Sequence, residues 1–358
     1  MRTRTLIVRS LTTGILMATI VSCKEIAGSS GPGPTEPTLL SVNSPTKDED
    51  PFVLLARDGT IIVAWFSDRG ANPDLYVSST KNRRDWTPAA RVTTSSAGDF
   101  YPNLYQDDQG LFHLTWFRWT ALNVGQIMYN TSADGVTWNT ATEVPATNTP
   151  NVDDWVPTIT GTADGTVLIY FVSKVRNTSN QQDDIYLAVK RPGVATFDAA
   201  VPLTVNSATL HDHLPFAART GAGVDLVWER HDLTQETPWL NPKSDLFHAT
   251  SPDGKTWSAP AKITNDAGNV VHLFPALYAD QQHQWSVLWL STRSGAPRAF
   301  ELSLNQLAGY PQTATVNSSL PEGYSHRIAP TTVPGLYIAA WVQGPEGAQD
   351  IYYRFFKR

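Results

Sequence analysis

The sequence predicts an all-β fold, a six-bladed β-propeller with four-stranded blades, and two regularities carry that prediction. A unit of short alternating strands and tight turns recurs about every 55 residues through the 358-residue chain, as repeat architectures do. Each unit opens on a proline that begins an apolar run, and the run ends in a large aromatic. The prolines are Pro51, Pro102, Pro157, Pro215, Pro275 and Pro330, and the aromatics are Trp65, Trp116, Tyr170, Trp228, Trp289 and Trp341. Aromatics at one repeated position are expected to pack between neighbouring blades.

Within each blade, the strands are named A to D from the axis outward. Asp-Gly pairs such as Asp58-Gly59 tolerate the positive φ of a two-residue hairpin, so they predict the A to B turns. Strand C starts at an acidic residue in four blades, which we interpret as a hydrogen-bonding strand start: Asp74, Asp184, Asp245 and Asp350. Strand D is a short outer strand, as in Ala90–Thr93.

The sixth unit provides no outer strand of its own, because Arg358 follows directly after its strand C. The segment Leu39–Ser44 precedes Pro51 in the way that 205–207 precede Pro215, so it has the sequence of an outer strand. We therefore expect this N-terminal strand to pair with the last blade and close the ring, which leaves no inner edge unpaired.

The N-terminus combines Arg2, Arg4 and Arg9 with an apolar run over 11–21, which is typical of an export signal rather than of a membrane-spanning helix. Ile20-Val21-Ser22-Cys23 resembles the lipobox of bacterial lipoproteins. The resemblance implies a lipid on Cys23 and a place in the cell envelope, on its periplasmic or outer side; a buried free thiol is the alternative. The predicted segments are a signal peptide over 1–23, a flexible linker over 24–37 and one propeller domain over 38–358.

The chain is acidic, with 33 acidic against 27 basic residues and a net charge of −6. Nucleic-acid binding needs positive charge that displaces counterions from phosphates, so nucleic acid is not an expected partner. A single cysteine leaves no intramolecular disulfide, so packing must stabilise the fold. We expect a monomer without a cofactor.

One motif occurs twice, as Ser132-x-Asp134-Gly135-x-Thr137-Trp138 and as Ser251-x-Asp253-Gly254-x-Thr256-Trp257. It resembles the Asp-box of the BNR repeat, which is found in sialidases and related six-bladed propellers. The resemblance implies a sialidase-like fold for about 38–358. The aspartate of such a turn is expected to accept backbone N–H bonds, so the motif bears on fold and not on chemistry.

The resemblance also implies a catalytic set on the face that carries the long loops. Sialidases use a tyrosine activated by a glutamate, an aspartate as acid/base, and arginines that hold the substrate carboxylate. Gly323-Tyr324-Ser325 matches the tyrosine motif, Glu229 matches the glutamate, and Asp68 takes the place of the aspartate. The arginines expected on this face are Arg118, Arg230, Arg293 and Arg327. Where sialidases open the first blade with an Arg-Ile-Pro motif, this chain has Asp48-Glu49-Asp50-Pro51.

A further regularity, separate from those that predict the fold, lies three residues before each anchoring proline. These positions hold Asp48, Asp99, Asp154, Asp212, His272 and Arg327. By the symmetry of the repeat, the six side chains are expected to form a polarised ring around the mouth of the central funnel and to bind substrate there. Each aspartate could instead cap the start of its own strand A, and calcium held by the acidic ring also stays open.

The sequence His211-Asp212-His213 raises the question of a metal site. Alternation along a strand places both histidines on the face opposite Asp212, and the sequence indicates no third ligand. A packed or solvent-facing pair of histidines is therefore favoured over a metal site.

These observations predict an exported propeller that binds a glycan or glycoconjugate and hydrolyses glycosidic bonds with funnel carboxylates, as an exo-acting glycoside hydrolase. A non-catalytic surface module that binds glycan or protein is the alternative. Aromatics in the loops, Trp119, Trp155 and Trp239, would stack on sugars under either hypothesis. Convergence of Glu229, Tyr324 and an acid would favour catalysis.

Overall fold

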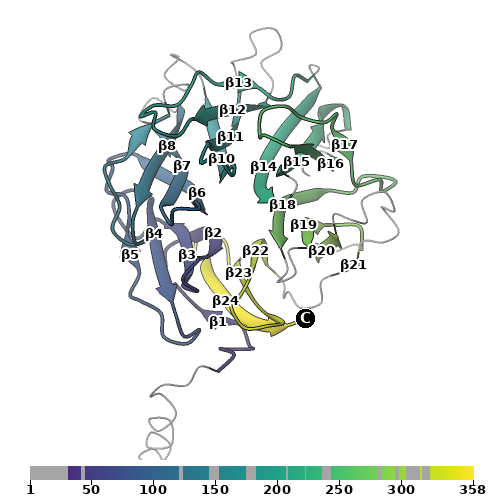
Figure 1. Cartoon of the computed structure of the whole chain (residues 1–358). Coiled ribbons are helices and arrows are strands. Elements are labelled where there is room, and N and C mark those ends of the chain that lie inside the picture. Colours follow the sequence, from purple (N-terminus) through teal and green to yellow (C-terminus); the bar gives the residue numbers. More distant parts are fainter. Residues whose placement is uncertain are drawn as a thin grey trace, which may run out of the picture.

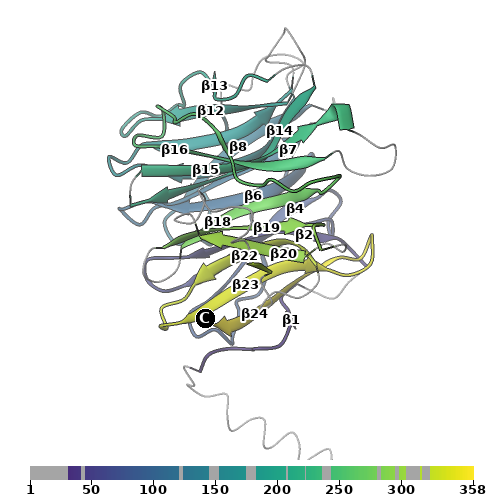
Figure 2. The ribbon, with the colours of Figure 1, turned by 90° about the vertical axis from the view of Figure 1, so that its right-hand side faces the viewer.

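The computed structural model describes residues 31–358 except 42–44, 121–123, 145–152, 175–182, 207–208, 222, 236–242, 280–283, 295–297, 304–314 and 317–322. Six antiparallel sheets of four strands each surround a central axis (Figure 1). Seen from the side, the strands run from one rim of the ring to the other (Figure 2). The fold is the six-bladed β-propeller that the repeat predicts. The predicted signal peptide, Cys23 and Trp239 lie outside the described residues.

The blades follow one another along the chain, each with its innermost strand first. Blade one is β2 (Asp48–Leu55), β3 (Ile61–Ser67), β4 (Asp74–Thr80) and β5 (Ala90–Arg91). Blade two is β6 (Gly98–Gln106), β7 (Phe112–Trp119), β8 (Gly125–Ser132) and β9 (Thr142–Glu143). Blade three is β10 (Asp154–Gly161), β11 (Val167–Ser173), β12 (Asp184–Lys190) and β13 (Val201–Pro202).

The second half of the ring repeats this order. Blade four is β14 (Leu210–Thr220), β15 (Gly223–Asp232), β16 (Ser244–Ser251) and β17 (Ala261–Lys262), with a 3-10 helix, η2 (Leu233–Gln235), after β15. Blade five is β18 (His272–Ala279), β19 (Trp285–Ser291), β20 (Arg298–Ser303) and β21 (Thr315–Val316). Blade six is β22 (Tyr324–Pro330), β23 (Leu336–Gln343), β24 (Asp350–Lys357) and the N-terminal β1 (Thr38–Leu39). In the described part of the chain, no helix has the length and apolar character needed to span a membrane.

The N-terminal strand closes the ring. β1 pairs antiparallel with β24, with Leu39 opposite Tyr352. The contact continues beyond the strand, because Ser41 Oγ accepts the Ile351 N–H at 3.0 Å and donates to Asp350 Oδ1 at 3.1 Å. The predicted closure is therefore confirmed, and the two ends of the described chain are joined within one sheet.

The core consists of apolar side chains packed between neighbouring blades. The six aromatics that end or approach the end of strand B are all at most 1% exposed, as their repeated position predicts: Trp65, Trp116, Tyr170, Trp228, Trp289 and Trp341. The turns between strands C and D also behave as expected. Asp134 Oδ1 accepts the backbone N–H groups of Val136 and Thr137 at 2.8 and 2.6 Å, and these bonds lower the pKa of Asp134 to about 2.

Every innermost strand carries the same irregularity near its start. The pairing register shifts there in all six blades, and one non-glycine residue takes a positive φ of 46° to 55°. The six residues are Asp50, Tyr101, Val156, Leu214, Phe274 and Ser325. Such a conformation costs about 1–3 kcal/mol per residue, and sites that keep it are often functional. We call these six residues the bulge ring.

The bulge ring corrects the predicted repeat in blade six. In the first five blades the positive-φ residue stands directly before the anchoring proline, whereas in blade six it is Ser325, which stands before His326. The equivalent of the prolines is therefore His326 and not Pro330. Arg327 consequently belongs one position after the anchor, where it pairs with Ala340 as Phe52 pairs with Ala64. Its place in the predicted ring, beside Asp48 and His272, is wrong and is taken by Gly323.

Candidate active site at the mouth of the central channel

The bulge ring lies at one mouth of the central channel. A small cavity there is lined by Asp50, Tyr101, Val156, Leu214 and Phe274 together with their following prolines and Arg327. The bulge turns these side chains toward the axis, whereas a regular strand would alternate them between the faces of the sheet. The side chains around this mouth come from all six blades, which makes it the candidate site.

Asp50 and Arg327 are the two charged groups of this cavity. Removal from water and the negative charge of Glu49 raise the pKa of Asp50 to about 7, although Arg327 acts in the opposite direction. Removal from water also lowers the pKa of Arg327 to about 10. Ser325 Oγ donates a hydrogen bond to Asp50 Oδ1 at 3.2 Å. A carboxyl whose pKa is raised this far above its ordinary value suits a general acid.

Arg327 reaches the axis without an ion pair in the described part of the chain. Its Nη1 donates to the backbone oxygen of His326 at 2.9 Å, its guanidinium lies 5.4 Å from the centre of the Phe216 ring, and its Nε has no hydrogen-bond partner among the described residues. Phe216 in turn stacks on Phe52 at 6.0 Å between ring centres. All three side chains line the small cavity that Asp50 also lines.

Tyr324 and Glu49 form a hydrogen-bonded pair across the junction of blades six and one. Tyr324 Oη donates to Glu49 Oε1 at 2.7 Å, and Lys47 Nζ lies 3.6 Å from the same oxygen. Burial and the glutamate raise the pKa of the Tyr324 hydroxyl, so the phenol is protonated at neutral pH. A hydroxyl bonded to a base that a third group orients is the arrangement of an activated nucleophile.

Glu229, at 1% exposure, approaches the same mouth from blade four. One carboxylate oxygen accepts the backbone N–H of Phe274, and the other lies 2.8 Å from His231 Nε2. The Phe274 ring stands between blades four and six, 6.1 Å from the ring of Tyr324. The charges of Asp50, Glu49 and Glu229 all raise the pKa of Tyr101, which is the common neighbour of these groups.

The structure thus brings Glu229 and Tyr324 to one rim, as predicted, but does not pair them. The tyrosine bonds Glu49 instead, because Phe274 of blade five intervenes between blades four and six. Asp68, the third residue of the predicted catalytic set, accepts the backbone N–H of Lys47 at 2.7 Å in the loop after β3. Asp68 therefore caps that loop. The carboxyl group that lines the small cavity at the mouth is that of Asp50.

The predicted open ring of aspartates is corrected by the structure. Asp48, Asp99, Asp154 and Asp212 are 0% exposed. Three of them form ion pairs through both carboxylate oxygens with an arginine near the end of strand B in their own blade, at 2.7 to 3.2 Å. Arg118 with Asp99 and Arg230 with Asp212 use two nitrogens, and Arg69 with Asp48 uses Nη2 alone. Pairing of this kind supports the alternative of a structural role, and it neutralises carboxylates that calcium would need.

In blade five a buried histidine, His272, stands where blades one to four have the buried aspartate, and the arginine pairs with a different acidic residue. Burial lowers the pKa of His272 to about 4, and Trp289 Nε1 donates to His272 Nδ1 at 3.2 Å. Arg293 bonds Asp266 at 2.6 Å. Arg118, Arg230 and Arg293, which were expected to hold a substrate carboxylate, are therefore all engaged with acidic side chains. Of the four predicted arginines, Arg327 alone faces the mouth.

Sequence reasoning missed Glu49, Asp50 and Tyr101 as members of the site. The signal was nevertheless present, because Asp50 and Tyr101 occupy the position directly before an anchoring proline. The prediction used the position three before the proline, where side chains turn into the blade. The bulge that separates these two positions was not visible in the repeat.

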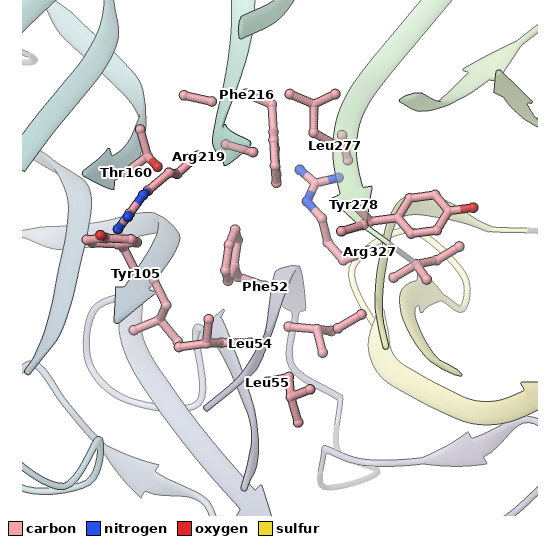
Figure 3. A pocket seen from close by; sticks show the side chains of 18 of the residues that line it. Phe52, Leu54, Leu55, Tyr105, Thr160, Phe216, Arg219, Leu277, Tyr278 and Arg327 are labelled. Carbon is pink, nitrogen blue, oxygen red and sulfur yellow. The ribbon is translucent and has the colours of Figure 1, made fainter. Parts of the chain in front are cut away.

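A larger cavity of about 450 Å³ occupies the other half of the channel (Figure 3). Its wall is mostly aliphatic and aromatic, with Leu54 and Leu277 among the lining residues, and Arg219 lies against Tyr105 at one side. Phe52, Phe216 and Arg327 line both this cavity and the small one at the bulge ring. The one carboxyl that lines either cavity, Asp50, therefore lies at the bulge-ring end, whereas tyrosines line both cavities.

No family model matches the sequence, and no curated protein was found to be related to it. Solved structures, in contrast, are similar in fold. Among solved structures, an α-L-arabinofuranosidase from Fusarium graminearum bound to an iminosugar inhibitor has a TM-score of 0.68 at 13% identity, covering 91% of this chain and 96% of its own. A Penicillium chrysogenum α-L-arabinanase in complex with arabinobiose has a TM-score of 0.65 at 12% identity, with 91% and 96% covered.

A microbial sialidase, Hadza microbial sialidase Hz136, has a TM-score of 0.61 at 12% identity, covering 87% of this chain and 65% of its own. These structures establish a similarity to six-bladed propellers that include sialidases and arabinan-degrading enzymes. At such identities the similarity concerns the fold.

Proposed function

Taking the sialidase-like six-bladed propeller as its fold, we propose that this chain is a glycoside hydrolase whose active site is the bulge-ring mouth. The observation that carries the proposal is the hydrogen bond of 2.7 Å between Tyr324 and Glu49, beside an Asp50 carboxyl whose pKa is about 7. Glycosidic cleavage needs an acid that protonates the leaving oxygen and a group that attacks or stabilises the sugar cation. The mouth provides both.

In this proposal Asp50 donates its proton to the glycosidic oxygen as the bond to the sugar breaks. Tyr324 attacks the anomeric carbon while Glu49 accepts the phenolic proton, since a protonated phenol is a weak nucleophile without a base. Glu229, fixed by His231 and by the Phe274 N–H, adds negative charge near the developing oxocarbenium ion. Water then attacks the anomeric carbon and gives a proton to Asp50, while the bond to Tyr324 breaks and Glu49 returns its proton to the phenolate oxygen.

The arginines favour a neutral sugar as substrate. Arg118 and Arg230 are neutralised by buried aspartates, which leaves Arg327 as the one predicted arginine at the mouth, whereas sialidases hold the substrate carboxylate with several. The arabinofuranosidase and the arabinanase among the similar folds act on neutral sugars by their names. α-L-Arabinofuranosides are therefore the first substrates to test, with sialosides as the comparison.

The test is a panel of chromogenic glycosides hydrolysed by the wild type, Tyr324→Phe and Glu229→Gln. We expect both variants to lose roughly 10²-fold or more in kcat, in line with loss of a nucleophile or an electrostatic stabiliser. Tyr105→Phe is the matched control, because Tyr105 lines the channel at its other end. Wild-type turnover that Tyr324→Phe leaves unchanged would reject the assigned nucleophile.

A second candidate is a non-catalytic glycan-binding module. Trp119 favours it, since this indole is 38% exposed at the end of β7, and exposed indoles stack on sugar rings. Glycan binding without turnover of any glycoside in the panel, lost in Trp119→Ala, would select this candidate over the hydrolase.

We propose that the chain works outside the cytoplasm as a lipoprotein anchored through Cys23. The basic residues, the apolar run and the Ile20–Cys23 motif of the sequence support this localisation. Mass spectrometry of the N-terminal peptide from membranes of an expressing bacterium would test it. An unmodified, uncleaved N-terminus would contradict it.

A further inference from the structure

Two histidines and an aspartate meet at the junction of blades three and four, next to the mouth but outside the bulge ring. His211 and His213 lie on β14, and Asp183 stands directly before β12. Asp183 Oδ2 is 2.9 Å from His211 Nδ1 and 2.8 Å from His213 Nε2. The three potential ligand atoms all lie within 4.8 Å of one another.

The local structure explains why these side chains meet. Strand alternation turns His211 and His213 to one face of β14, while Asp212 turns to the other face and pairs with Arg230. The Asp212 N–H donates to the backbone oxygen of Asp183 at 2.8 Å, which holds Asp183 beside the histidine pair. The third ligand that the sequence did not indicate therefore comes from the neighbouring blade.

A second observation, the burial of Asp183, also favours a cation at this place. Asp183 is only 5% exposed, and its Oδ1 is buried without a hydrogen-bond partner in the described part of the chain. A buried carboxylate with an unsatisfied oxygen is costly, and a bound cation would satisfy it.

From this geometry we propose that Asp183, His211 and His213 form a binding site for a divalent transition-metal ion of the Zn²⁺ type. Two imidazole nitrogens and one carboxylate suit such an ion, and three protein ligands leave a further position for water. The ligands would bind at about 2.0–2.2 Å, with the ring protons of His211 Nδ1 and His213 Nε2 moving to the other ring nitrogens through solvent.

The proposed metal would link blade three to blade four and would hold in place the side chains next to Glu229. His213 stacks on His231 at 4.8 Å between ring centres, and His231 holds Glu229. Trp155 packs edge-on against His213 at 5.1 Å. The site is thus one layer of side chains away from the groups assigned to catalysis, and it does not depend on that assignment.

The test is calorimetric titration of the EDTA-treated, dialysed protein with ZnCl₂, together with visible spectroscopy after addition of Co²⁺. We expect one equivalent to bind to the wild type, a rise in melting temperature, and Co²⁺ absorption bands in the visible range. Asp183→Asn and His213→Ala should weaken binding by at least roughly 10-fold, because even outer-shell partners of metal sites contribute that much.

His248→Ala is the matched control, since His248 forms a buried pair with Asp225 at 2.6 Å and belongs to no such cluster among the described residues. This variant should bind Zn²⁺ like the wild type. Absence of stoichiometric binding to the wild type, or equal affinity in folded Asp183→Asn, would overturn the proposal. Asp183→Asn keeps the size of the side chain, so circular dichroism can establish that it folds.

Discussion

Asp50→Asn is expected to lower kcat for glycoside hydrolysis by roughly 10²- to 10⁴-fold, the range that general acid catalysis contributes. The carboxyl of Asp50 has a pKa of about 7, so it can donate a proton at neutral pH, whereas an amide cannot. In the wild type, kcat should fall as pH rises through about 7, because the acid form is lost. Steady-state kinetics between pH 5 and 9 measure both effects.

The same substitution should stabilise the fold at alkaline pH. The folded-state pKa of Asp50 lies above the ordinary value of 3.8, so the unfolded chain ionises first as pH rises. The free energy of unfolding contributed by this group is therefore full below pH 4, declines between about pH 4 and pH 7, and stays low above. A neutral amide at this position has no such loss, so the melting temperature of Asp50→Asn at pH 8 should exceed that of the wild type.

Asp58→Asn is the matched control for both measurements. Asp58 is an exposed aspartate in the turn between β2 and β3, on the opposite rim, and hydrogen bonds from Thr60 hold its pKa at about 2. Its replacement should leave kcat, and the fall of kcat above pH 7, unchanged. It should not raise the melting temperature at pH 8. Full activity in Asp50→Asn, with an unaltered pH profile, would remove Asp50 from the mechanism.

Arg118→Met is expected to destabilise the protein by about 3–5 kcal/mol, the cost of leaving a buried charge without its partner. Asp99 is 0% exposed and receives two bonds from Arg118 and one from Trp116 Nε1. Removing the guanidinium leaves the Asp99 carboxylate inside blade two, with the Trp116 indole as its remaining side-chain partner among the described residues. Urea unfolding at pH 7 measures the loss.

The control is Arg191→Met, which breaks an exposed pair with Asp198 at 2.8 Å and should cost no more than about 1 kcal/mol. The double variant Asp99→Asn, Arg118→Met should recover part of the stability, because no unpaired charge remains. If Arg118→Met is as stable as the wild type but binds glycan more weakly, Arg118 is a substrate-binding residue, as the sequence alone suggested.

The fold could be predicted from the sequence because its causes are local and repeated. Each unit contains its own tight turn and buried aromatic, and the outer strand that closes the ring has the sequence of the other outer strands. Blade six shows where repetition fails as a guide. Pro330 lies closer to Trp341 than the other prolines lie to their aromatics, and the register places His326 in the anchor position.

The site could be predicted only in part because side-chain direction depends on the bulge. Glu229 and Tyr324 were found through their motifs, and they do reach one rim. Asp48 and Asp50 are two residues apart, yet one turns into the blade and the other into the channel. The sequence alone assigns the arginines to a substrate, because their buried partners, such as Asp99 and Asp212, can be recognised only when strands A and B are paired.

The central claim is that the mouth keeps one aspartic acid protonated near neutral pH. Carboxyl ¹³C resonances of protein labelled at aspartate, followed from pH 3 to 9 in the wild type and in Asp50→Asn, test it directly. We expect one resonance that titrates near pH 7 in the wild type and is missing in the variant. A wild-type spectrum in which every aspartate has titrated by pH 5 would contradict the account.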